Sequence, residues 1–164
     1  MMKWGYLGLA LLLCVGSCSK EDKHLESAAR EVAEKFHAAV GPFDTQTLLK
    51  LVDYPFRLDG KIVRDERELL EALVKKKVAL RRAVSPATRM EVVTYESFID
   101  GKPLSGRSFS PEEARAQADK IGFKKGGVLV RCYHEEDGRE DGRQYFLVMH
   151  PDALGDLRIT SYHD

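Results

Sequence analysis

Apolar side chains recur every three or four residues in three segments of the first half of the chain. Residues 25–40 have mainly charged side chains between the apolar ones, which predicts an amphipathic helix ending at Gly41-Pro42. A second, shorter helix is expected after Asp44 and a third after Asp65, because aspartate favours the N-cap position. The three helix predictions rest on these apolar positions, in chain order: Leu25, Ala29, Val32, Phe36 and Val40; Leu48, Leu49, Leu51 and Val52; and Leu69, Leu70, Leu73, Val74 and Leu80.

The second half of the chain has the pattern of β-strands, with apolar and β-branched residues in short runs. Before these runs, Asp59-Gly60 predicts a small β-hairpin over residues 54–63, because this pair suits a two-residue turn. The longer strands are expected at residues 89–99, 128–134, 144–149 and 157–162.

Two segments interrupt this succession of strands. Residues 101–126 are expected to form a helical insertion, in which Ser110-Pro111 has the residues of a helix start. Few residues of that helix are apolar, so we expect it to lie on the surface. Residues 135–142 are charged and contain glycine, which predicts a loop.

The N-terminus has the pattern of an export signal. Lys3 is followed by an uncharged, leucine-rich stretch over residues 4–16, which is short for a membrane span and typical of a secretory signal peptide. The stretch ends in Val15-Gly16-Ser17-Cys18, an aliphatic residue and two small residues before a cysteine. The alternative reading is an ordinary signal peptide in which the cysteine is coincidental.

The tetrapeptide Val15–Cys18 resembles the lipobox of bacterial lipoproteins. This resemblance implies cleavage between Ser17 and Cys18 and attachment of acyl chains such as palmitate to Cys18, which would hold the protein on a membrane. Ser19 resembles the residue of lipoproteins sorted to the outer membrane, so we expect a protein that faces the periplasm. The expected organisation is a signal peptide over residues 1–17, a lipidated tether over residues 18–24 and a single domain over residues 25–164.

Charge and cysteine content narrow the possible partners. Removal of residues 1–17 takes away only Lys3, so 25 Lys+Arg (26 minus 1) remain against 26 Asp+Glu. This balance argues against nucleic acid as a partner, because binding to phosphates needs an excess of positive charge. With Cys18 acylated, Cys132 is the only free thiol, so no internal disulfide is expected.

The order of elements, two helices, a hairpin, a third helix and then long strands, resembles the nuclear transport factor two and ketosteroid isomerase superfamily. The resemblance implies an α+β domain of the cystatin-like cone type, in which N-terminal helices pack on a strongly bent antiparallel sheet. It also implies a pocket at the open end of the cone and, in many members, dimerisation through the sheet. The insertion at about residues 101–126 departs from the simplest version of this fold.

The resemblance also suggests where a catalytic or binding site would lie. Enzymes of the isomerase type place a carboxylate base near the end of the second helix, where Asp53 is found, with a tyrosine such as Tyr54 as hydroxyl donor. Candidate ligand-binding residues are His37, Tyr95, Tyr133 and Tyr145. The alternative reading of these residues is structural, because aspartates commonly lie at helix ends and tyrosines commonly pack within sheets.

Metal and nucleophile chemistry have little support in the sequence. His134 and His163 end two predicted strands and are the candidate metal ligands, but no paired-histidine or paired-cysteine spacing is present. Cys132 lies within a strand and no Gly-x-Ser-x-Gly segment occurs. We therefore expect no metal and no cofactor.

Three functions remain open on these grounds. The first is a non-catalytic, lipid-anchored envelope protein that binds a small apolar ligand or a partner protein. The second is an enzyme of the isomerase or dehydratase type that uses Asp53 and a tyrosine. The third is a structural or assembly lipoprotein that forms a homodimer through its sheet, with Val128, Val130 and Cys132 on the contact face.

Overall fold

The computed structural model describes residues 20–84 and 89–164 of the chain. The predicted signal peptide, the cleavage site at Ser17 and the lipidation site at Cys18 lie outside the described residues. None of the described helices is long and apolar enough to cross a membrane.

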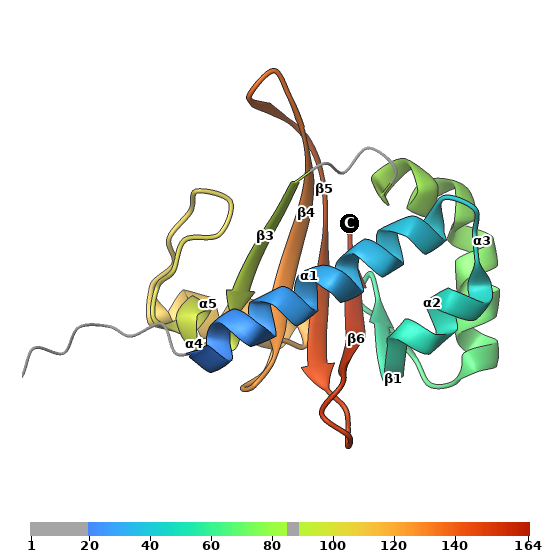
Figure 1. Cartoon of the computed structure of the whole chain (residues 1–164), viewed down its shortest axis with the longest axis horizontal. Coiled ribbons are helices and arrows are strands. Elements are labelled where there is room, and N and C mark those ends of the chain that lie inside the picture. The colour runs from blue at the N-terminus through green and yellow to red at the C-terminus, as the bar shows by residue number, and fades with distance from the viewer. Residues whose placement is uncertain (1–19, 85–88) are drawn as a thin grey trace, which may run out of the picture.

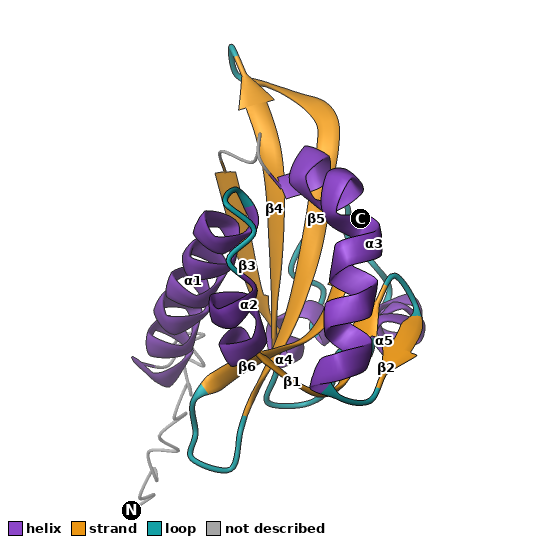
Figure 2. Cartoon of the chain, turned by 90° about the vertical axis from the view of Figure 1, so that its right-hand side faces the viewer, coloured by secondary structure: helices purple, strands orange, loops and turns teal. Residues whose placement is uncertain are grey.

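The three predicted helices are α1 (Lys20–Val40), α2 (Thr45–Leu51) and α3 (Glu66–Val84). Both predicted caps are present, since Asp44 accepts a hydrogen bond from the Thr47 amide and Asp65 accepts one from the Glu68 amide. Helix α1 begins at Lys20, so residues 20–24 of the predicted tether are helical. Figures 1 and 2 show these three helices grouped on one side of the strands.

The strands form one six-stranded sheet in the order β2-β1-β6-β5-β4-β3. Most neighbours are antiparallel, but β1 and β6 pair in parallel, so the sheet is mixed and not wholly antiparallel. The expected fold class, an α+β domain with N-terminal helices on a sheet, is confirmed. The strands are β1 (Val52–Leu58), β2 (Lys61–Val63), β3 (Arg89–Thr94), β4 (Val128–Glu136), β5 (Arg139–Pro151) and β6 (Leu157–His163).

Two local predictions were wrong. Residues 95–99, expected as the end of a strand, form the short helix α4 (Tyr95–Ile99), because the Thr94 side chain accepts the Ser97 amide and caps a helix there. Residues 135–142, expected as a loop, belong mainly to β4 and β5, which pair as far as Glu136 and Arg139 around a turn at Asp137-Gly138. The resulting hairpin extends beyond the helices (Figure 1).

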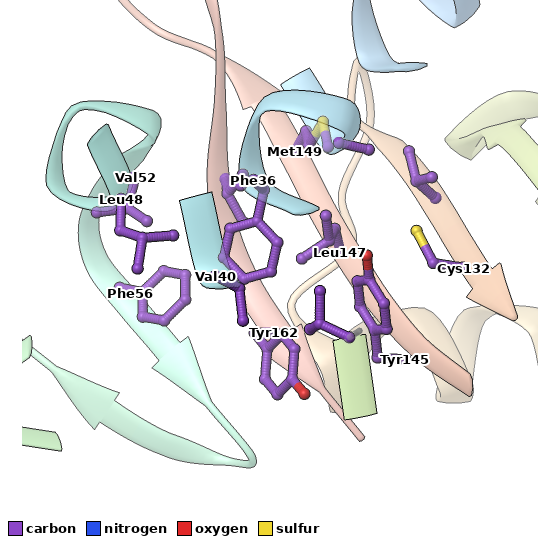
Figure 3. Packing of buried hydrophobic residues seen from close by; sticks show 14 of the residues in the cluster. Phe36, Val40, Leu48, Val52, Phe56, Cys132, Tyr145, Leu147, Met149 and Tyr162 are labelled. Carbon is purple, nitrogen blue, oxygen red and sulfur yellow. The ribbon is translucent and has the colours of Figure 1, made fainter. Parts of the chain in front are cut away.

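The main hydrophobic core lies between the three helices and one face of the sheet, which we call the inner face. Val128, Val130 and Cys132, proposed from the sequence as a dimer contact, are fully buried in this core. That assignment was wrong because these alternate residues of β4 point toward the helices and not toward solvent. Figure 3 shows Cys132 among the side chains of this core, with Tyr145, Leu147 and Met149 of β5.

The predicted insertion contains helix α5 (Pro111–Ile121), and its start at Ser110 has the expected capping box. As expected, this helix lies on the surface with most of its residues exposed, but it also packs on the sheet. Ala114 and Ala118 are buried against the opposite, outer face of the sheet. Since alanine is small, a helix with few large apolar residues can still pack closely. The second core that it closes contains Val93, Phe98, Leu104, Phe123, Leu129 and Val148.

Candidate functional site

The inner core is occupied by aromatic side chains. Tyr145 and Tyr162 stack with ring centroids 5.8 Å apart, and Phe36 lies 6.2 and 6.0 Å from them (Figure 3). Burial raises the pKa of both tyrosines and raises the pKa of the neighbouring Cys132 thiol to about 11. These groups are therefore neutral at physiological pH and supply no charge for acid–base chemistry in this part of the core.

Asp53 does not occupy the position of a base in a dry pocket. It lies in β1 beyond the end of α2, its side chain is exposed, and its carboxylate accepts the Tyr54 amide at 2.9 Å. Tyr54 packs against the inner core, and its hydroxyl is buried without a hydrogen-bond partner among the described residues. Burial, with smaller effects of Glu66 and Asp65, raises the pKa of Tyr54. Asp53 and Tyr54 therefore do not form the pair of base and hydroxyl donor that the resemblance suggested.

The four candidate ligand-binding residues do not meet at one site. Tyr145 lies in the inner core. The Tyr95 ring packs edge-on against Phe123 in the second core, on the outer face of the sheet, with ring centroids 5.4 Å apart. Tyr133 lies on the outer face under the guanidinium of Arg131, 4.3 Å from its ring centroid. His37 of α1 has a buried Nδ1 without a partner in the described part of the chain, and burial lowers its pKa.

The two candidate metal ligands are also separated. His134 lies in the β4–β5 hairpin, where its Nδ1 is 2.7 Å from the Asp141 carboxylate. His163 lies in β6 opposite Phe146, two strands away from β4, and its Nε2 is 2.6 Å from the Ser161 hydroxyl. Within residues 20–84 and 89–164, no three His, Cys, Asp or Glu side chains are grouped so that they could hold a metal ion.

The most buried charge on the outer face is Arg131, which is 2% exposed. Its guanidinium donates to Glu91 at 2.8 Å, to Gln144 at 2.7 Å and to Glu140. These contacts engage all three nitrogens of the guanidinium and join β3, β4 and β5. Arg131 therefore acts as a structural residue.

A pocket of about 250 Å³ opens elsewhere on the outer face, between β1, β5, β6 and the loop after α5. Its wall includes Arg57 of β1, His150 of β5, Thr160 of β6 and the loop residues Gly122 and Lys124. None of the seven residues that line it is acidic. We call it the outer pocket.

The Arg57 side chain passes close to the backbone of Gly122. A Cβ at residue 122 would lie 3.0 Å from Arg57 Nε and 3.2 Å from its Cδ. Gly122 ends α5 in the left-handed conformation, with φ of 75°, so glycine serves both the helix end and the approach of the arginine. Arg57 is half-buried and has no carboxylate partner among the described residues.

His150 is fixed by hydrogen bonds at both ring nitrogens. The Lys124 amide donates to Nε2 at 3.2 Å, so the ring proton lies on Nδ1 and is shared with the Thr160 hydroxyl at 2.8 Å. The Thr160 hydroxyl in turn donates to the Val148 carbonyl at 3.3 Å. Burial, with the nearby Lys124 charge, lowers the pKa of His150, so the ring is a neutral wall of the outer pocket.

Comparison with known proteins gives similarity at the level of fold. No protein-family model matches the chain, and no curated protein matches it. Among solved structures, a candidate ketosteroid isomerase from Shewanella frigidimarina NCIMB 400 is 17% identical over 85% of this chain and 95% of that chain, with a TM-score of 0.45. An NTF2-like protein with a cystatin-like fold from Novosphingobium aromaticivorans is 10% identical over 90% of each chain, with a TM-score of 0.40. These similarities transfer no function to this chain.

Sequence reasoning missed the outer pocket. Gly122 and Lys124 lie in the segment expected only to be a helical insertion, and Arg57 and His150 were not among the candidate site residues. These residues come from separate elements and have no common spacing, so no local motif connects them. The one available signal was the pair of glycines around Lys124, which marks a close approach of other groups to the backbone.

Proposed function

We propose that the protein is exported, anchored to the cell envelope through lipidated Cys18, and binds a small ligand or a partner protein there without catalysing a reaction. The lipobox-like segment Val15–Cys18 supports the anchor. Helix α1 begins at Lys20, two residues after the proposed attachment point, so the domain would lie close to the membrane surface. By the residue that follows Cys18, this would be the outer membrane on its periplasmic side.

The observation that carries the binding function is the outer pocket itself. It presents a half-buried Arg57 that has no carboxylate partner among the described residues and whose side chain passes close to Gly122. A cation that is partly removed from water without a partner favours binding of an anionic group. The pocket wall has no carboxylate or thiol, and both nitrogens of its histidine are engaged in hydrogen bonds.

Two other expectations receive less support from the geometry. A small apolar ligand needs an apolar cavity, and the part of the inner core around Phe36, Tyr145 and Tyr162 is filled by these side chains. An isomerase-type reaction needs a base beside a pocket hydroxyl, and the exposed Asp53 is hydrogen-bonded to the backbone of Tyr54. Binding of a polar ligand fits the described residues better than either.

The anchor is tested by expressing the full chain in a Gram-negative host and separating its membranes from its soluble proteins. We expect the wild type in the outer membrane with an acylated N-terminal peptide beginning at Cys18. Cys18→Ala should lose acylation, whereas the matched variant Cys14→Ala should keep it. An unacylated wild type, or loss of acylation in Cys14→Ala alone, would contradict the proposal.

A further inference from the structure

We infer that the outer pocket binds a small oxyanion of the phosphate class, with Arg57 as the principal contact and Lys124 as the second. This inference rests on the proposed binding function and names the chemistry of the ligand. It does not depend on the lipid anchor.

The charges around the outer pocket favour an anion. Arg57 and Lys124 are the two cations of the wall, and no acidic residue lines it. Lys120 and Arg57 also lie close enough to His163 to lower its pKa, next to the larger effect of burial. Asp164, which acts on His163 in the opposite sense, and Glu96, which accepts a hydrogen bond from the Gly126 amide, are acidic groups near the pocket, but neither is part of its wall. Two cations without a carboxylate between them leave a positive site.

Part of the pocket wall is formed before any ligand arrives. The His150 ring is held between the Lys124 amide and Thr160, and the Arg57 side chain passes beside Gly122, where no Cβ obstructs it. Gly127 makes the space for that ring, because a Cβ there would lie 2.6 Å from His150 Nε2. A wall that is already formed loses little conformational freedom on binding, which favours affinity.

The size of the outer pocket and the geometry of its donors favour an oxyanion of the phosphate class. The volume of about 250 Å³ suits a small group. The planar guanidinium presents parallel N–H donors that match two oxygens of a phosphate, and a lysine ammonium supplies a second charge. Such a group can come from free phosphate or from the head group of an anionic phospholipid, since the proposed anchor keeps the domain beside a membrane.

The test uses the purified full chain in a non-ionic detergent and two probes, inorganic phosphate and a short-chain phosphatidylglycerol. Binding is measured by isothermal titration for the wild type, Arg57→Gln, Arg57→Lys and the control Arg67→Gln, an exposed residue of α3 outside the pocket. We expect saturable binding of at least one probe, weakened at least about tenfold by Arg57→Gln and less by Arg57→Lys. Arg67→Gln should bind like the wild type.

The results of these titrations either support or overturn oxyanion binding at the outer pocket. Binding of phosphate identifies a free anion as the source, and binding of the phospholipid alone identifies a head group; both support the inference when Arg57→Gln reduces them. No binding of either probe, or equal losses in Arg57→Gln and Arg67→Gln, overturns it. Acylation of Cys18 is measured separately, so failure here is distinguishable from failure of the anchor.

Discussion

The imidazole of His150 lies directly against the backbone of Gly127. A Cβ at residue 127 would come within 2.6 Å of His150 Nε2 and 2.7 Å of its Cδ2. Unlike Gly122, Gly127 has no left-handed backbone conformation, so glycine is needed there for space alone. The space left by Gly127 lets His150 occupy the position from which it accepts the Lys124 amide and donates to Thr160.

Gly127→Ala should therefore destabilise the protein and disturb the outer pocket. The added methyl group must displace His150, which breaks its hydrogen bonds, and overpacking of this kind costs about 1–3 kcal/mol. Urea unfolding measures the change. Gly41→Ala is the control, because no atom lies within 4 Å of a Cβ there, and we expect a change below about 1 kcal/mol. Equal changes in both variants would show that His150 is not constrained by Gly127.

Arg131→Met should lower the free energy of unfolding by about 1–3 kcal/mol, because Glu91 and Glu140 lose their charged donor. We expect the lower part of this range, since these side chains are 37% and 45% exposed and water solvates them. Urea unfolding checks the value. Arg139→Met, an exposed residue of the same hairpin, should change stability by less than about 0.5 kcal/mol.

The stability difference between wild type and Arg131→Met should also depend on pH. The hydrogen bond from Arg131 holds the pKa of Glu140 below its ordinary value of 4.5. A carboxyl with a lowered pKa in the folded state stabilises the protein above its unfolded pKa, and this contribution is lost as the pH falls through the folded pKa. The difference in unfolding free energy between wild type and Arg131→Met should thus narrow below pH 4.5. A difference that stays constant down to pH 3 would contradict this assignment.

Cys132 should resist alkylation while the protein is folded. Burial raises its pKa to about 11, so roughly one thiol in a thousand is ionised at pH 8, and the side chain is fully buried. Iodoacetamide should leave the peptide that contains Cys132 unmodified in native protein and modify it after unfolding in urea. Ser108→Cys, at an exposed position, is the positive control. Labelling of both cysteines at similar rates in native protein would show that Cys132 is accessible.

Ser110→Ala should destabilise the protein by about 1 kcal/mol, because the Ser110 hydroxyl accepts the Glu113 amide and caps α5. Since α5 closes the outer core, the loss should appear as a lower midpoint of global urea unfolding. Ser108→Ala, which removes an exposed hydroxyl two residues earlier, should leave that midpoint unchanged. Equal midpoints for the two variants would mean that the cap contributes nothing.

Most elements followed from local patterns in the sequence. Asp44, Asp65 and Ser110 were predicted as helix caps, and each accepts the expected backbone amide. The Asp59-Gly60 turn was also predicted, because both residues can adopt the positive φ that they have in the structure. Such features depend on a few neighbouring residues, so the sequence contains the information needed to place them.

Features that depend on distant partners were not predictable. The packing of α5 on the sheet depends on Phe98 and Phe123 as well as on its own two alanines. Asp53 was proposed as a base from its place after the second helix, but only the fold shows that its side chain is exposed. Arg57, Lys124 and His150 belong to three separate elements, and the register of the sheet brings them together.

The most direct test of the central claim is the mass of the membrane-extracted full chain under native and denaturing conditions, for wild type and Arg57→Gln. If the protein binds a ligand in the outer pocket, the native wild type should carry an extra mass that denaturation removes and that Arg57→Gln lacks. A native wild type without added mass, or the same added mass on both proteins, would contradict binding at this pocket.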